Sequence, residues 1–108
     1  MSTVLGLFRC DAMALKIPPR VKVKARVFYK VVWQEVIDGK PDCLGLCDPN
    51  SRTIIIKLGQ SDTETIKTFI HEVLHAIEAE YETPIPHRIT YTLEEGVFQV
   101  LKLNRWLK

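Results

Sequence analysis

Residues 61–81 read SDTETIKTFIHEVLHAIEAEY, and they combine a helix-start signal with a long apolar stripe. Ser61 and Glu64 form a capping box, in which the serine oxygen accepts from the Glu64 amide and the glutamate reaches back to the Ser61 amide. Apolar residues then recur at the spacing of one helical face: Ile66, Phe69, Ile70, Val73 and Ile77. This spacing predicts an amphipathic helix over about residues 62–81, with the stripe packed on a core.

The middle of this helix contains His71-Glu72-Val73-Leu74-His75, the pattern H-E-x-x-H. Four residues of helix advance by about 400°, so the two imidazoles project from the same side, one turn apart. Two neutral imidazoles suit zinc, and a catalytic zinc needs a third protein ligand and one open position. Glu72 lies about 100° round the helix, where it can act as general base toward a metal-activated water. The alternative is two solvated histidines, but both flank the apolar stripe, which favours a cleft wall.

Length and composition indicate one ordinary globular domain. The chain has 108 residues, of which 46% are hydrophobic and 26% charged. The excess of 15 basic over 13 acidic residues is small, so a nucleic acid partner is not expected. No apolar run reaches the roughly 18 residues of a membrane-spanning helix, and no membrane partner is expected either. We expect a monomer or a weak oligomer.

The three cysteines favour a reducing, cytoplasmic location, because an odd number argues against a disulfide framework. The short apolar piece at residues 4–8 lacks a preceding basic region, so a signal peptide is not expected. Cys43 and Cys47 are interpreted as small apolar fillers beside a turn.

Residues 1–20 show no clear period and end in two prolines, so they are interpreted as a flexible N-terminal extension before one catalytic domain over residues 21–108. From Val21, apolar and mostly basic residues alternate, which predicts a strand that continues to Ile37 with a bend or bulge near residues 29–31. Its basic face is interpreted as solvated surface.

Two shorter strands are predicted at residues 44–47 and 52–58, separated by turn sequences, which suggests an antiparallel meander. After a break at residues 83–86, a second helix begins between Pro86 and Thr92 and runs to about Leu103. The predicted fold class is α+β: a small antiparallel or mixed twisted sheet packed on the H-E-x-x-H helix, followed by a C-terminal helix.

The second helix carries Leu93-Glu94-Glu95-Gly96. Together with the first motif, over about residues 50–103, it resembles the gluzincin metallopeptidases, most of all the very small minigluzincins and short H-E-x-x-H proteins of phages and mobile elements. In that clan the third zinc ligand is a glutamate 19 or 20 residues after the second histidine, followed by a small residue. Both Glu94 and Glu95 satisfy the spacing, and Gly96 favours Glu95.

Two alternatives for the third ligand stay open. Thr92 and Glu95 could form a capping box of their own, which would leave Glu94 as the ligand. His87 would instead resemble the third ligand of SprT-like proteins. For stabilising an oxyanion, the resemblance implies a histidine or tyrosine, so Tyr91 and His87 are the catalytic candidates, with Tyr81 behind them. Gln99 stands where larger gluzincins often have an acidic residue that supports a histidine.

The resemblance implies a small zinc-dependent endopeptidase with Zn²⁺ as cofactor and His71, His75 and Glu95 as ligands. Its peptide or protein substrate would pair with the edge strand Thr53 to Leu58, as an added strand. One alternative is a catalytically weak or inactive zinc-binding interaction module of a phage or mobile element, with residues 104–108 reaching back over the cleft. Another is an SprT-like DNA-associated protease.

Overall fold

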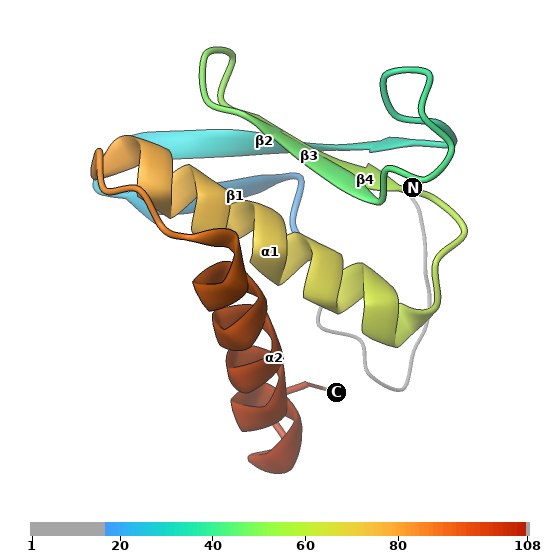
Figure 1. Cartoon of the computed structure of the whole chain (residues 1–108), viewed down its shortest axis with the longest axis vertical. Coiled ribbons are helices and arrows are strands. Elements are labelled where there is room, and N and C mark those ends of the chain that lie inside the picture. Colours follow the sequence, from blue (N-terminus) through green and yellow to red (C-terminus); the bar gives the residue numbers. More distant parts are fainter. Residues whose placement is uncertain (1–16, 108) are drawn as a thin grey trace.

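The computed structural model describes residues 17–107, which form a mixed sheet of four strands and two helices (Figure 1). The predicted α+β class is therefore confirmed. The elements in chain order are β1 (Arg20–Lys24), β2 (Val27–Gln34), β3 (Gly45–Asp48), β4 (Thr53–Lys57), α1 (Asp62–Glu80) and α2 (His87–Leu103). Both helices lie close to their predicted bounds.

The first strand prediction was wrong, because residues 21–37 contain a hairpin. β1 and β2 pair antiparallel, with Val21 opposite Tyr29, and the chain reverses at Ala25 and Arg26. Arg26 has φ 64°, in the left-handed region that tight hairpin turns require. Alanine and arginine are not typical turn residues. A bulge between Lys22 and Lys24 also brings odd-numbered residues of both strands to the same face, as in Val21 opposite Tyr29. The pattern therefore runs through the reversal as if the strand continued.

The predicted meander was also wrong. β4 pairs in parallel with β2, Val31 opposite Ile54, and β3 pairs antiparallel with the other side of β4, Leu46 opposite Ile55. The strand order is β1-β2-β4-β3, so β4 is an interior strand and β3 is an edge. A continuous run of isoleucines suits a strand that is flanked on both sides, which is the position β4 takes.

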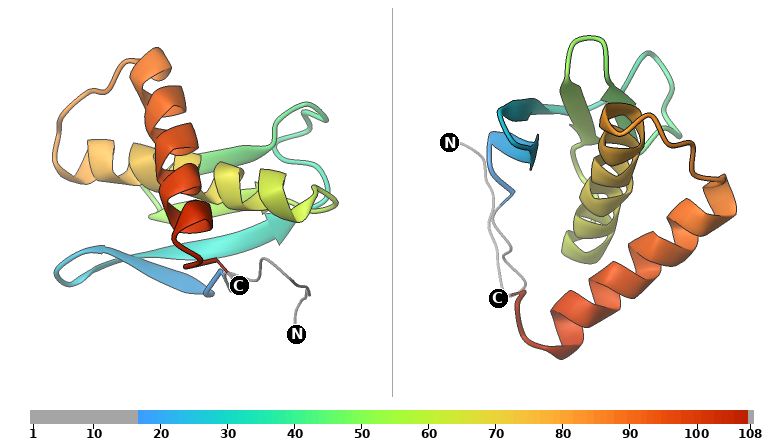
Figure 2. Two further views of the ribbon diagram at one scale, coloured as in Figure 1. Left: turned by 90° about the horizontal axis from the view of Figure 1, so that it is seen from below. Right: turned by 90° about the vertical axis from the view of Figure 1, so that its left-hand side faces the viewer.

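The sheet, α1 and α2 stack as successive layers, and α2 contacts α1 on the side away from the sheet (Figure 1, Figure 2). One buried cluster fills the space between the sheet and α1: Tyr29, Val31, Ile54, Ile56, Phe69 and Ala76. A second cluster joins α1 to α2: Ile66, Ile70, Phe98 and Leu107. The predicted apolar stripe of α1 thus packs on the sheet through Phe69 and on α2 through Ile66 and Ile70. These contacts hold the helix between the two layers.

Polar contacts at both ends hold α1 in place. At its start, the Ser61 hydroxyl accepts from the Glu64 amide at 3.2 Å, as the capping box predicts. At its end, the Glu80 carboxylate accepts two hydrogen bonds from Arg52, at 3.0 and 3.1 Å, and one from the Tyr29 hydroxyl at 2.8 Å. The Arg52 hydrogen bonds, and then that of Tyr29, hold the pKa of Glu80 below its usual value.

The termini differ in part from the prediction. Ile17 packs against the sheet cluster, and the Pro19 carbonyl accepts from the Val31 amide at 2.9 Å, so the domain begins before residue 21. The rest of the predicted extension, residues 1–16, lies outside the described part of the chain. At the other end Leu107 is buried between α1 and α2, whereas Trp106 is 63% exposed. Neither helix that the structure describes is long and apolar enough to cross a bilayer.

Candidate functional site

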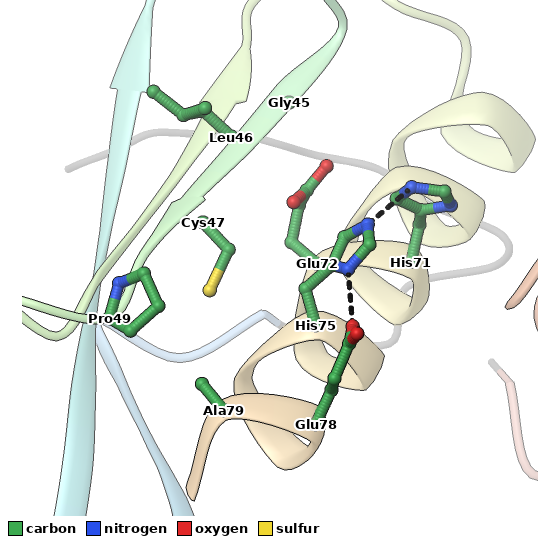
Figure 3. Close-up of a pocket in the computed structure, with 9 residues that line it drawn as sticks. All are labelled: Gly45, Leu46, Cys47, Pro49, His71, Glu72, His75, Glu78 and Ala79. Atoms are coloured by element: carbon green, nitrogen blue, oxygen red, sulfur yellow. Dashed lines mark hydrogen bonds and ion pairs between the residues drawn. The ribbon is translucent and has the colours of Figure 1, made fainter. Parts of the chain in front are cut away.

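His71 and His75 lie side by side on α1, with their rings 4.7 Å apart between centroids (Figure 3). Their Nε2 atoms face each other at 3.1 Å. Both side chains are mostly shielded from solvent, and both line the same pocket. The helical spacing therefore brings the two imidazoles to one point, as the motif predicts.

The outer nitrogen of each imidazole meets a carboxylate. Nδ1 of His71 lies 2.9 Å from Glu94 Oε1, and Nδ1 of His75 lies 3.0 Å from Glu78 Oε1. Glu78 also accepts from the Ile85 amide at 2.9 Å, which is the largest of the effects that lower its pKa and keep it ionised. Each Nδ1 can donate to its carboxylate, and a neutral ring in that tautomer presents a lone pair at Nε2.

Two such lone pairs 3.1 Å apart can be bridged by one metal ion. Zinc bonds to imidazole nitrogens are about 2.0–2.1 Å long. Two such bonds to atoms 3.1 Å apart enclose roughly 100°, near the tetrahedral value. The histidine pair thus fits zinc, but within residues 17–107 no group of three His, Cys, Asp or Glu side chains forms a complete ligand set. A third ligand would have to turn in from a neighbouring position.

The structure does not bring Glu95 to the histidines. Its side chain is 53% exposed, and its carboxylate lies 2.8 Å from the Lys67 ammonium group and accepts from the Gln99 amide at 2.9 Å. Glu94 contacts His71 instead, and Glu95 has no capping role because α2 begins upstream, at His87. Lys67 stands on α1, one turn before His71, and only the packing of α2 on α1 brings it to Glu95.

The first turns of α2 bring the two remaining candidates next to the motif. The His87 ring lies 5.6 Å from the His75 ring, and the Tyr91 ring lies 5.1 Å from the His71 ring. Both side chains are exposed and border the site without bonding to the imidazoles. Tyr81 is exposed with the Lys24 ammonium group 4.8 Å from its ring, and Gln99 supports Glu95, so the support expected for His71 comes from Glu94.

Glu72 is only 6% exposed, and its carboxylate points into the gap between α1 and β3 (Figure 3). Its pKa is raised to about 7, mainly by burial; His75 opposes this rise, and the Glu94 charge adds to it. A carboxylate with this pKa can both take and release a proton near neutral pH. This is the property that a general base and acid needs.

Gly45 is the residue of β3 that makes room for Glu72, and sequence reasoning missed it. A Cβ on Gly45 would lie 2.9 Å from Glu72 Oε2 and 2.6 Å from the Thr68 methyl group. A side chain at this position would therefore force Thr68, Glu72 or β3 itself to shift. The available signal was a glycine inside a short strand, which often marks a close approach. Glu78 was also missed, although it stands three residues after His75 on the same helix.

A pocket of about 500 Å³ lies between β3 and α1. It is lined by Gly45, Leu46, Cys47, Pro49, His71, Glu72, His75, Glu78 and Ala79 (Figure 3). Burial raises the pKa of the Cys47 thiol to about 12, so the thiol stays protonated and acts as the filler that the sequence predicts. The substrate strand predicted at Thr53 to Leu58 was wrong, because β4 is paired on both sides, and the free edge beside this pocket belongs to β3.

The chain matches no protein-family model, no curated protein and no solved structure. The resemblance to gluzincins therefore rests on the sequence motifs alone.

Proposed function

We propose that this protein is a small zinc-dependent peptidase. The observation that carries the proposal is the pair of Nε2 atoms of His71 and His75, 3.1 Å apart, each on a ring whose Nδ1 donates to a carboxylate. Carboxylates behind metal-binding histidines are common because they fix the tautomer and raise the basicity of the ligand.

The third ligand is Glu94 or His87. Glu94 becomes a ligand if its carboxylate leaves Nδ1 of His71 and turns toward the Nε2 side. If Glu94 remains behind His71, the position falls to His87, whose exposed ring lies 5.6 Å from that of His75. The first choice gives the gluzincin ligand set, and the second gives the set that resembles SprT-like proteins.

When bound, zinc would polarise a substrate carbonyl and lower the pKa of a water molecule. Glu72 takes the proton from the attacking water and returns it to the leaving amine, because its buried carboxylate exchanges a proton near pH 7. Tyr91 and His87 stand at the open side of the site, where an O–H or N–H can donate to the developing oxyanion. No covalent intermediate is needed.

An extended peptide would bind along β3. The Lys57 amide donates to the Leu44 carbonyl, and the alternation of antiparallel pairs then turns the peptide groups of Gly45 and Cys47 toward the free edge. A substrate strand that pairs with this edge carries its backbone past Glu72, over which Gly45 lies. Backbone pairing of this kind suits a site with few side-chain pockets.

Zinc stoichiometry by elemental analysis tests the proposal, with a casein or peptide-library assay on the same samples. We expect one zinc per chain in the wild type, loss of zinc in His75→Ala, retention in Glu72→Gln and Glu95→Ala, and peptidase activity in the wild type and Glu95→Ala. Loss in only one of Glu94→Ala and His87→Ala identifies the third ligand. A wild type without zinc after reconstitution would refute the proposal.

The alternative to an enzyme is a zinc-binding interaction module that cleaves no peptide. It predicts the same zinc stoichiometry but no cleavage by the wild type. The idea that the tail blocks the cleft loses support, because Leu107 packs between α1 and α2 and Trp106 borders a groove on α2. Truncation after Leu103 is therefore expected to lower stability rather than to release activity.

A further inference from the structure

Charge is strongly segregated in this protein, although its net charge is only +2. The four strands contain five basic residues and one acidic residue, Asp48. Helix α1 shows the reverse, with five acidic residues and one basic residue, Lys67. A near-neutral total thus hides a basic sheet and an acidic helix, which present different surfaces to a partner.

One face of the sheet is not covered by the helices. α1 and α2 lie on the same side of the sheet (Figure 1, Figure 2). Tyr29 and Ile54 point to that side and are buried under α1. Because side chains alternate along a strand, their neighbours point to the opposite side. We call this side the open face, and six of its residues carry the argument: Arg20, Lys22, Phe28, Lys30, Leu46 and Ile55.

The cations of the open face lie close together on β1 and β2. Arg20 lies directly opposite Lys30 in the β1–β2 pair, and like charges in that position destabilise a sheet. The Arg20 guanidinium lies 4.4 Å from the centroid of the Phe28 ring, and the Lys22 ammonium lies 5.5 Å from it. Within residues 17–107, none of these three cations takes part in an ion pair. The arrangement suits an anion that is supplied from outside.

Apolar side chains continue this surface across the sheet. Phe28 is 39% exposed and Leu46 38%, and Ile55, which is partly exposed, lies opposite Leu46 in the β3–β4 pair. The open face therefore combines a cationic half on β1 and β2 with an aliphatic half on β4 and β3. A partner that matches both halves needs acidic and apolar groups on one side.

We infer that the open face binds an acidic amphipathic segment of another protein. Carboxylates of the segment meet Arg20, Lys22 and Lys30, and its apolar side chains cover Phe28, Leu46 and Ile55. A single-stranded nucleic acid fits less well, because the apolar half is aliphatic and Arg20 already stacks on the one aromatic ring. The pocket lies between β3 and α1, on the helix side of the sheet, and shares only Leu46 with the open face.

The test uses a fluorescein-labelled amphipathic peptide with leucine on one helical face and glutamate on the other, and a copy with glutamine in place of every glutamate. Fluorescence anisotropy should show binding of the acidic peptide to the full chain, with amide NMR shifts concentrated in β1 and β2. Lys30→Glu should weaken this binding at least about fivefold, since it removes one attraction and adds a repulsion. The matched control is Lys102→Glu, the same charge reversal on α2, which should leave the affinity unchanged.

Lys30→Glu also creates an opposite-charge pair with Arg20, so its thermal midpoint should rise while binding falls. Loss of binding therefore cannot be explained by unfolding. Equal affinity for the glutamine copy, no loss in Lys30→Glu, or no binding to the wild type would overturn the inference. Tighter binding of oligothymidine or phosphatidylserine vesicles with the same sensitivity to Lys30→Glu would also overturn it, and would assign the open face to nucleic acid or to membrane.

Discussion

The two sides of the sheet handle charge differently. On the helix side, Glu94 and Glu78 each face an imidazole nitrogen, and Glu80 accepts from Arg52 and Tyr29. On the open face, Arg20 and Lys30 oppose each other, and no ion pair among the described residues includes either. Paired charges fix geometry, which a site needs, whereas unpaired like charges oppose folding and gain only from a partner. The net charge of +2 reveals neither the ion pairs of the helix side nor the cations of the open face.

The largest expected effect on activity is at Glu72, the buried carboxylate on the helix side of the sheet. Glu72→Gln keeps the size of the side chain but removes the proton acceptor, so peptidase activity should fall by about 10²–10⁴-fold while zinc content stays at the wild-type value. Activity is measured on a peptide library and zinc by elemental analysis. Full activity in this variant would mean that the buried carboxylate is structural.

The second largest expected effect is a loss of zinc affinity when a carboxylate that accepts from a histidine Nδ1 is removed. Glu78→Gln leaves Nδ1 of His75 without an ionised acceptor, so zinc affinity should fall about 10–100-fold in a chelator competition titration. Glu95→Gln is the matched control, because its carboxylate bonds to Lys67 and Gln99 away from the imidazoles. Equal losses in the two variants would show that surface charge, rather than tautomer control, sets the affinity.

A steric test of the same side compares two glycines. Gly45→Ala places a methyl group 2.6 Å from the Thr68 methyl and 2.9 Å from Glu72, so urea unfolding should show a loss of about 1–3 kcal/mol. Gly96→Ala, on an exposed part of α2 with no atom within 4 Å of the new methyl, should instead gain about 0.5–1 kcal/mol. An unchanged stability in Gly45→Ala would mean that β3 moves freely away from α1.

The Glu80 contacts predict how stability depends on pH. The pKa of Glu80 is lowered in the folded state, so its contribution is complete above the unfolded value of about 4.3 and is lost as pH falls through the lowered value. Arg52→Gln should therefore be less stable than the wild type at neutral pH, and the gap should narrow in acid. Urea unfolding of both proteins, from neutral pH down to below the pKa of Glu80, measures how this difference in stability changes. Arg88→Gln, on α2, should show a gap that does not vary with pH.

Local signals predicted the helices and the histidine pair, whereas the errors came from non-local contacts. The capping box at Ser61 and the apolar stripe need only neighbouring residues, and both predicted α1. The parallel pairing of β2 with β4 depends on residues more than 20 positions apart, such as Val31 and Ile54, and alternation carries no information on it.

The candidate site divides in the same way. Spacing alone admitted Glu94 and Glu95, which point about 100° apart on a helix. The choice between them depended on how α2 crosses α1 and on Lys67, which holds Glu95. Gly45 and the edge position of β3 could not be read from the motif, because both depend on the strand order.

The smallest expected effect is on the free energy of unfolding, and it measures the repulsion between Arg20 and Lys30 on the open face. Lys30→Glu turns the Arg20–Lys30 contact into an opposite-charge pair, which should raise the free energy of unfolding by about 0.2–1 kcal/mol at low salt. The gain should shrink in high salt, because exposed charges are screened. Lys102→Glu removes a cation from the last turn of α2 and should lose stability instead. If Lys30→Glu gives no gain at low salt, solvent already relieves the repulsion, and the two sides of the sheet differ in composition without differing in energy.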